Sequence, residues 1–149
     1  MRIFWEKTQD TEIERLFPFT RGTVEDSLRH FEQAQRPDST SFGQVILLDG
    51  RYVGDVWCYS IDEVEEKQAF VSIVLFDKVI WGHGVGTEAL GLFRAMVFQR
   101  FSIDKLCAFA YKANTRSDRL LKKTGFKEIE EFKEDGVPSR YYELAKPQK

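Results

Sequence analysis

The apolar positions of the chain switch between two periods, and each switch marks the boundary of a predicted element. Alternating or continuous apolar runs predict strands, and apolar residues spaced three and four apart predict helices. The predicted strands cover residues 2–5, 45–48, 52–59, 69–76, 105–111, 126–133 and 140–144, and the predicted helices cover residues 11–16, 24–34, 87–100 and 114–124. The order βααβββαβαββ indicates an α/β (α+β) fold, a mixed central sheet of about seven strands with helices on both faces.

Local signals indicate how these strands connect. Asp49-Gly50 and Asp135-Gly136 each separate two strand-like runs, and Asp-Gly favours the two-residue turn of a hairpin. The run 69–76 is almost continuously apolar, which predicts a central strand covered on both faces. Because a glycine-rich loop and a helix separate this run from the strand at 105–111, the two strands are predicted to be parallel.

Composition narrows the class of protein. The chain has 149 residues, of which 42% are hydrophobic and 31% charged, as in a single globular domain over residues 1–149. No apolar stretch approaches the roughly 18 residues that cross a bilayer, and no secretory signal begins the chain, so we expect a cytoplasmic protein without membrane contact. The net charge of −2 disfavours nucleic acid as a partner. Cys58 and Cys107 lie in apolar runs without metal-binding spacing, which predicts buried free thiols.

The most informative junction is a loop with three glycines, Gly82, Gly84 and Gly86, between a predicted buried strand and a helix. Missing Cβ atoms allow positive φ and close approach, so backbone N–H groups of the loop and of the first helical turn can converge on an anion. Thr87 adds a hydroxyl donor. The Walker, dinucleotide and kinase phosphate loops all require residues that are missing here. A tight turn without a ligand is the alternative.

Two stretches resemble one known family. Residues 76–90, FDKVIWGHGVGTEAL, resemble the acyl-CoA loop of the GNAT N-acetyltransferases, and residues 114–126, NTRSDRLLKKTGF, are similar to the family's Asn-x-x-Ser helix that ends in Gly-Phe. With the element order, the resemblance spans residues 2–144 and is closest to the branch that acetylates ribosomal-protein N-termini. It implies the GNAT fold with two central strands splayed apart, acetyl-CoA as the acyl donor, and direct transfer of the acetyl group to a primary amine in a ternary complex.

The resemblance also implies a binding site for the donor. Leu75 and Phe76 would pair with the pantetheine amides as an added strand does, and a main-chain N–H near Phe76 would polarise the thioester carbonyl. The loop residues expected to hold the diphosphate are His83, Gly84, Val85, Gly86 and Thr87. Asn114 would either orient the cofactor or cap its helix.

The expected catalytic residues are Ser117, Glu66 and Glu143. Ser117 corresponds to the serine that the ribosomal-protein branch is thought to use as a proton donor, although the residue type also fits a solvated first-turn serine. Tyr111 is a reserve donor. Glu66 and Glu143 are candidates for the base that takes the proton of the amine, with plain surface charges as the alternative.

Two positions depart from the family pattern. Trp81 stands where the family prefers Gln or Arg, and Leu121 stands where many members carry a tyrosine that protonates the thiolate. The residues that could compensate for Trp81 are Lys78, His83 and Arg119. These departures favour, as the alternative function, a non-catalytic module that binds acyl-CoA. A nucleotide-binding protein is a third hypothesis.

The expected acceptor is a small-molecule amine or a protein N-terminus. In this fold it would lie beside the N-terminal helices and the first hairpin. Four aromatic residues could form a wall there, with ordinary core packing as the alternative for each: Phe17, Phe19, Trp57 and Tyr59. The acidic segment 62–66 would favour a cationic acceptor if it bordered that mouth. The sequence leaves a homodimer open.

Overall fold

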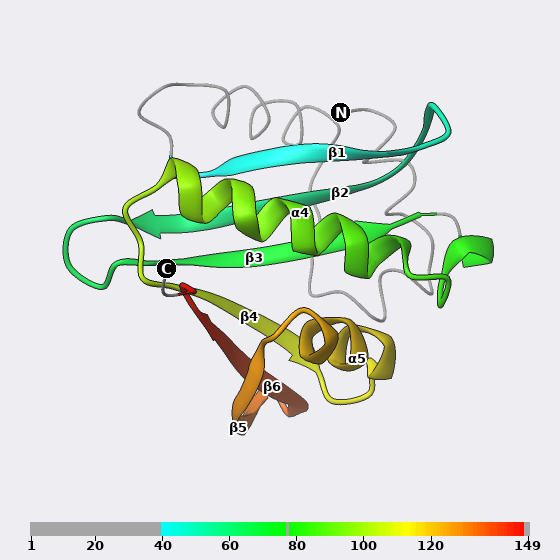
Figure 1. Ribbon diagram of the computed structural model, residues 1–149. Helices are drawn as coiled ribbons and strands as arrows, with labels where there is room; N and C mark the ends of the chain where they lie inside the picture. The colour runs from blue at the N-terminus through cyan, green and yellow to red at the C-terminus, as the bar shows by residue number, and fades with distance from the viewer. Residues whose placement is uncertain (1–39, 77, 148–149) are drawn as a thin grey trace, which may run out of the picture.

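The computed structural model describes residues 40–76 and 78–147, which build one mixed sheet, two α-helices and a short 3₁₀-helix (Figure 1). The strand order is β1-β2-β3-β4-β6-β5. The strands are β1 (Phe42–Leu48), β2 (Arg51–Asp62), β3 (Gln68–Leu75), β4 (Lys105–Tyr111), β5 (Lys127–Glu134) and β6 (Val137–Ala145), and the helices are the short 3₁₀-helix η1 (Lys78–Ile80), α4 (Val85–Arg100) and α5 (Thr115–Lys123). The strand predicted at 2–5 and the helices at 11–16 and 24–34 lie outside the described residues.

The two central strands, β3 and β4, are parallel as predicted, but they pair over a short length only. Their register ends at Phe70↔Cys107, so residues 71–75 of β3 and 108–111 of β4 face each other without a ladder. Beyond this point β3 continues beside β2, whereas β4 follows β6 (Figure 1). The predicted splay is therefore confirmed, and it opens toward the end of β3 that leads into the glycine loop.

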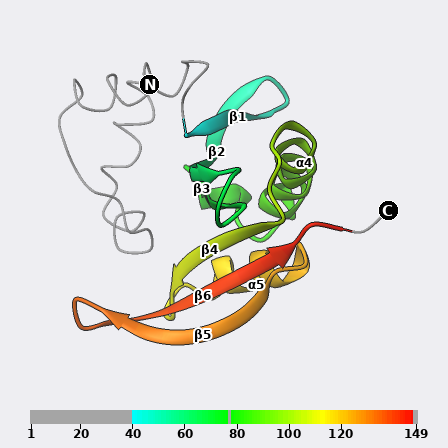
Figure 2. The same cartoon turned by 90° about the vertical axis from the view of Figure 1, so that its left-hand side faces the viewer.

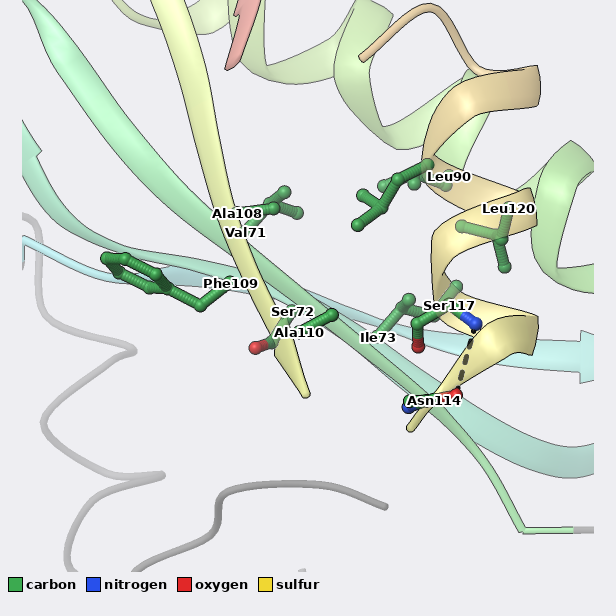
Figure 3. Close-up of a pocket in the computed structure, with 11 residues that line it drawn as sticks. Val71, Ser72, Ile73, Leu90, Ala108, Phe109, Ala110, Asn114, Ser117 and Leu120 are labelled. Atoms are coloured by element: carbon green, nitrogen blue, oxygen red, sulfur yellow. Dashed lines mark hydrogen bonds between the residues drawn. The ribbon is translucent and has the colours of Figure 1, made fainter. Parts of the chain in front are cut away.

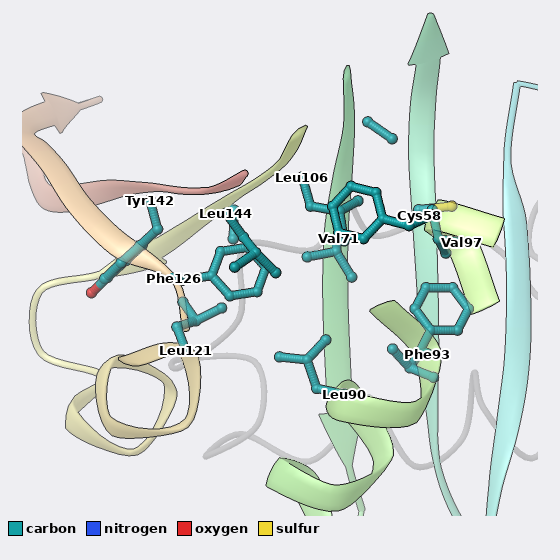
Figure 4. Packing of buried hydrophobic residues seen from close by; sticks show 14 of the residues in the cluster. Cys58, Val71, Leu90, Phe93, Val97, Leu106, Leu121, Phe126, Tyr142 and Leu144 are labelled. Carbon is teal, nitrogen blue, oxygen red and sulfur yellow. The ribbon is translucent and has the colours of Figure 1, made fainter. Parts of the chain in front are cut away.

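The α-helices α4 and α5 cover the same face of the sheet (Figure 2). Leu90, Phe93 and Val97 of α4 share one core with Leu121 of α5 and with Tyr142 of β6 (Figure 4). We call the opposite face, which no described helix covers, the helix-free face. Helices on both faces thus stay a prediction that depends on the N-terminal segment. No described helix is long and apolar enough to span a membrane.

Local sequence signals are confirmed where they concern turns, caps and thiols. Asp49-Gly50 and Asp135-Gly136 form the two hairpin turns, with positive φ at all four residues. Gly125, with φ 100°, ends α5, and Phe126 is buried directly after it. The sulfhydryls at positions 58 and 107 are free and buried.

Polar contacts hold α5 in place against the sheet. Asp118 of α5 accepts hydrogen bonds from the Tyr142 hydroxyl, at 2.7 Å, and from Nη1 of Arg140, at 3.2 Å. Arg94 of α4 donates to the Thr124 carbonyl at the other end of α5. Because both ends are tied, α5 presents a fixed face to the splayed strands.

Replacing Tyr142 by Phe tests this attachment. We expect Tyr142→Phe to lower the free energy of unfolding by about 1–3 kcal/mol, since a hydrogen bond to a carboxylate is lost inside the protein. The matched control is Tyr59→Phe, because no hydrogen bond is found for the Tyr59 hydroxyl among the described residues, and we expect a change below about 0.5 kcal/mol. Urea denaturation of both variants gives the comparison, and equal losses would contradict the assigned role.

Candidate active site

The loop between β3 and α4 depends on glycine at two positions. Gly82 and Gly84 have φ of 82° and 84°, in the left-handed region where a side chain is strained. The positive φ predicted for this loop is therefore found. Gly86 serves a different purpose, because it lies inside α4, and a Cβ there would come within 2.5 Å of the Leu120 side chain. The glycine at 86 thus allows α4 and α5 to approach closely.

The N-terminus of α4 carries unused hydrogen-bond donors. Gly84 is the N-cap and supplies no side-chain cap. The N–H of Glu88 donates to the Gly84 carbonyl at 3.0 Å, and the three preceding N–H groups, residues 85–87, have no acceptor among the described residues. These donors add to the positive end of the helix dipole, so the first turn of α4 favours an anion.

A cavity of about 230 Å³ lies between this turn and α5; we call it the large cavity. Its lining comprises Ile73, Leu75, Ile80, Trp81, Gly82, Gly84, Gly86, Thr87, Asn114, Arg116, Ser117, Arg119, Leu120 and Lys123. Three of these residues, Arg116, Arg119 and Lys123, are cations on α5, and none forms an ion pair with another described residue. The wall opposite the glycine loop is therefore positively charged.

A second cavity, of about 40 Å³, lies where β3 and β4 diverge (Figure 3); we call it the small cavity. It shares Ile73, Asn114, Ser117 and Leu120 with the large cavity, so the two cavities adjoin each other. Its lining is mostly apolar and includes residues that alternate along β3 and β4 and so belong to both faces. The gap between the strands thus connects the helix-covered face with the helix-free face.

Asn114 and Ser117 stand at the junction of the two cavities. The side-chain oxygen of Asn114 accepts a hydrogen bond from the Ser117 N–H at 3.1 Å, so Asn114 caps α5. The Ser117 hydroxyl has no hydrogen-bond partner among the described residues and projects from α5 toward the strands (Figure 3). A hydroxyl placed in this way can donate a proton to a group held in the gap.

Comparison with known proteins decides the family. The profile of the family described as "Acetyltransferase (GNAT) domain" matches residues 2–127. This chain belongs to the GNAT family. A search of the curated proteins finds no match for this chain.

Solved structures agree with this fold. Aminoglycoside acetyltransferase AAC(6′)-Ib in complex with coenzyme A has a TM-score of 0.79 and 16% identity, covering 96% of this chain and 87% of its own. Spermidine N-acetyltransferase from Vibrio cholerae, with CoA and spermine, has a TM-score of 0.80 and 14% identity, covering 97% and 88%. RimJ from Mycobacterium smegmatis, with CoA-disulfide, has a TM-score of 0.81 and 18% identity, covering 96% and 76%. At these identities the likeness shows that the GNAT fold is shared.

The predicted cofactor-binding residues of this GNAT domain divide into two groups. Those that line the large cavity are Leu75, Gly84, Gly86, Thr87 and Asn114, and those that do not are Phe76, His83 and Val85. The N–H groups of Phe76 and His83 already donate to Val53 O, at 2.8 Å, and to Ile80 O, at 3.3 Å. Val85 packs its side chain against the core, and only its N–H remains for an anion.

The main-chain donor expected near Phe76 is therefore not the Phe76 N–H itself. Because the Phe76 N–H faces β2, alternation along β3 turns the main-chain groups of Leu75 and Ile73 toward the opening. The Leu75 carbonyl is already occupied there, since the Trp81 indole N–H donates to it at 3.0 Å. The guanidinium of Arg116 lies 4.7 Å from the centre of the Trp81 ring.

The expected compensation for Trp81 also changes. Of Lys78, His83 and Arg119, only Arg119 lines the large cavity. Arg116 lines it too and was missed from the sequence. The sequence signal that could have identified Arg116 is its position, because the helix dipole disfavours a basic residue in the first turn of a helix.

Neither predicted glutamate base lines either cavity. Glu66 is exposed in the turn before β3, where its N–H donates to Asp62, and roughly 20 Å of strand separate it from Ser72. The whole acidic segment 62–66 lies at this closed end and does not border the mouth. Glu143 accepts hydrogen bonds from the Tyr141 hydroxyl, at 2.6 Å, and from Lys105, at 2.9 Å, and these two donors lower its pKa. Its carboxylate is thus a weakened base.

A carboxyl group that the sequence analysis missed lies on the strand beside the divergent part of β3. Asp55 of β2 is paired with Val74, beside the divergent part of β3. Burial raises the pKa of Asp55 to about 6, although a hydrogen bond from the Tyr52 hydroxyl opposes this shift. Tyr52 packs edge-on against Phe76, with ring centres 5.3 Å apart. The signal in the sequence was one acid within the apolar run 52–59.

Aromatic rings cross the helix-free face beside the gap. Tyr59 stacks on Phe70 at 5.7 Å, Phe70 stacks on Phe109 at 5.3 Å, and Phe109 lies 5.3 Å from Tyr141. Tyr59 thus belongs to an aromatic surface, and Trp57 packs in the neighbouring cluster with Val74. The other two members of the predicted wall, Phe17 and Phe19, lie outside the described residues.

Two further positions concern proton donation to the thiolate. Leu121 is buried in the core and lines the small cavity, so this GNAT domain has an apolar group where many members carry a tyrosine. Tyr111, the last residue of β4, lines neither cavity. Ser117 is therefore the hydroxyl nearest the gap on α5.

Proposed function

We propose that the protein is an N-acetyltransferase that moves the acetyl group of acetyl-CoA to a primary amine. The observation that carries the proposal is the adjoining pair of cavities, which together extend from the unused N–H groups of α4 to the gap between β3 and β4. Family membership and neighbours whose structures hold CoA support acetyl-CoA as the donor.

The residues suggest how the donor lies. The diphosphate takes the first turn of α4 and faces the cations of α5, because both supply positive potential. The pantetheine arm follows the open edge of β3, where Ile73 and Leu75 present main-chain groups. The acetyl group then enters the mostly apolar small cavity next to Ser117.

The acceptor amine approaches from the helix-free face along the aromatic surface. Its nitrogen attacks the acetyl carbon, the C–S bond breaks, and the sulfur leaves as a thiolate. Asp55 takes the proton of the amine through a water molecule, and the Ser117 hydroxyl donates a hydrogen bond to the sulfur. Tight positioning of both reactants supplies most of the rate enhancement. The sulfur needs little help to leave, because thiols ionise near pH 8.5.

The acceptor is a small amine or a protein N-terminus. The neighbours named above are an aminoglycoside acetyltransferase, a spermidine acetyltransferase and RimJ, so the test panel contains an aminoglycoside, a polyamine and peptides with free N-termini. We favour the ribosomal-protein type of acceptor because of the Asn114-x-x-Ser117 pattern, and RimJ as a neighbour supports it.

Thiol release with this panel tests the proposal. We expect acetyl-CoA to raise the melting temperature and one amine class to release CoA above background, with an acetylated product seen by mass spectrometry. Binding of acetyl-CoA without release from any amine would favour the acyl-CoA-binding module, which Leu121 and the indole bond to Leu75 support. Preferred binding of ATP over CoA would favour the nucleotide-binding hypothesis.

Replacing Ser117 by Ala tests the proton donor. We expect Ser117→Ala to lower kcat by roughly 3- to 30-fold, because the thiolate needs little acid help, and to leave the Kd of acetyl-CoA within about twofold. Ser102→Ala, an exposed serine after α4, is the control. Full turnover in Ser117→Ala would remove Ser117 from the mechanism.

A further inference from the structure

Trp81 makes two contacts across the mouth of the large cavity. Its indole N–H donates to the Leu75 carbonyl at 3.0 Å, and its ring carries the Arg116 guanidinium at 4.7 Å. The first contact occupies a main-chain acceptor on the open edge of β3. The second holds a cation that lines the same cavity as the glycine loop. Both contacts lie where a long ligand along this edge would bind.

Arg116 occupies an unfavourable electrostatic position. It is the second residue of α5, in the first turn, where the helix dipole repels a cation. No described carboxylate pairs with it, whereas Lys122 in the last turn of the same helix pairs with Asp118 at 3.2 Å. The Trp81 ring is its only described partner, and a guanidinium binds a phosphate more strongly than an aromatic face.

We propose that Arg116 is a ligand of the donor's diphosphate and that the Trp81 ring holds the Arg116 guanidinium until the donor binds. The inference rests on the proposed function and deepens it. When a pantetheine thioester with a diphosphate enters, the guanidinium moves from the indole to the phosphate oxygens, and the indole leaves the Leu75 carbonyl. That carbonyl then accepts a pantetheine amide N–H. Arg116 thereby supplies the charge that Trp81 cannot supply.

The two halves of the exchange differ in their energetics. Donor binding replaces the indole–carbonyl hydrogen bond by an amide–carbonyl hydrogen bond. This exchange slows the pairing of the pantetheine arm with β3 and adds no affinity. Moving Arg116 replaces a cation–π contact by a charge-assisted, bidentate pairing, so it favours the bound state. Affinity for the diphosphate therefore depends on Arg116, and affinity for the pantetheine arm depends on release of the Trp81 indole.

Calorimetric titrations with CoA, and displacement titrations with pantetheine, separate these two parts. We expect Arg116→Ala to weaken CoA binding by roughly 10- to 100-fold and to leave pantetheine binding within about twofold, since pantetheine lacks the diphosphate. Arg116→Lys is expected to lie between Arg116→Ala and the wild type. Lys122→Ala removes the same charge from the same helix outside the cavity and is expected to stay within about threefold of the wild type.

Trp81→Phe tests the indole. It keeps the aromatic face for Arg116 and removes the N–H, so we expect both CoA and pantetheine to bind roughly 2- to 10-fold more tightly. Donor binding should also change the tryptophan fluorescence of the wild type and of Trp57→Phe, and this change should be absent in Trp81→Phe. Unchanged affinities in Trp81→Phe would overturn the release step.

Other outcomes also decide between the assignments. Equal losses of CoA affinity in Arg116→Ala and Lys122→Ala would overturn the inference in favour of a general charge effect. A penalty of Arg116→Ala that vanishes with 3′-dephospho-CoA would place Arg116 on the 3′-phosphate and overturn the diphosphate assignment. Failure of the wild type to bind CoA at all would instead overturn the proposed function, and this result is seen before any variant is compared.

Discussion

Gly84→Glu is expected to weaken acetyl-CoA binding by at least about 100-fold, or roughly 2.7 kcal/mol. Gly84 caps α4 and lines the large cavity, with open space where its Cβ would stand. A glutamate there needs no room from its neighbours, and its carboxylate satisfies the N–H groups that we assign to the diphosphate. The anion site is then filled from within, and a negative charge repels the donor.

Two variants separate this charge effect from backbone strain. Gly84→Asn tolerates positive φ and caps helices well, but it is neutral, so we expect it to lose no more than about tenfold in affinity. Gly91→Glu adds the same charge farther along α4, where a Cβ also meets open space, and we expect it to bind nearly as the wild type does. Calorimetry gives the three constants. A Gly84→Glu protein with wild-type affinity would refute the loop assignment.

Asp55→Asn is expected to lower kcat/KM by roughly 100-fold, because the variant lacks the general base. The acid limb of the pH profile of kcat/KM should also be absent in this variant. The limb should lie near pH 6, because burial raises the pKa of Asp55 to about 6. Tyr52→Phe, which removes the hydrogen bond that favours the carboxylate, should move this limb to higher pH. Asp49→Asn, in the β1–β2 turn, is the control.

The same substitution should stabilise the fold. The pKa of Asp55 rises from 3.8 to about 6 on folding, so the folded protein holds this proton more strongly than the unfolded chain does. Stability therefore falls as the pH rises from about 4 to about 6, and the loss persists at neutral pH. Asn mimics the protonated side chain, so Asp55→Asn should unfold at higher urea concentration than the wild type at pH 7.5, and the difference should disappear below pH 4. A variant with unchanged stability and unchanged kcat/KM would exclude Asp55 from both roles.

A gain in stability together with a loss in turnover distinguishes function from packing. Replacing a residue that only supports the fold lowers both the stability and the turnover. An ionised group kept on a half-buried strand against its desolvation cost is typical of a site where chemistry requires the charge. This contrast makes Asp55 a better-defined candidate than Glu66, which was predicted from its position before the central strand, or Glu143, which was predicted from its position on the last strand.

Much of the fold could be predicted because its signals are local. The two Asp-Gly turns, the Gly125-Phe126 helix stop and the Asn114 cap depend on neighbours within a few residues, and all are found. The boundaries differ slightly, since α4 begins at Val85 and includes Gly86. Gly86 is helical because close packing against Leu120 needs a residue without a side chain, and this reason lies outside the local sequence.

The sequence by itself determined the element order, the family resemblance, the glycine loop and the Asn114-x-x-Ser117 helix, since short-range backbone preferences and motif spacing suffice for these. The tertiary structure decided which end of β3 opens, and this places Glu66 far from the gap. It also decided that Lys105 and Tyr141 donate hydrogen bonds to the Glu143 carboxylate. It also placed the Trp81 indole on Leu75, Arg116 on Trp81 and Asp55 beside the opening. These contacts join residues from different strands and helices, and only strand register and helix packing determine which side chains meet.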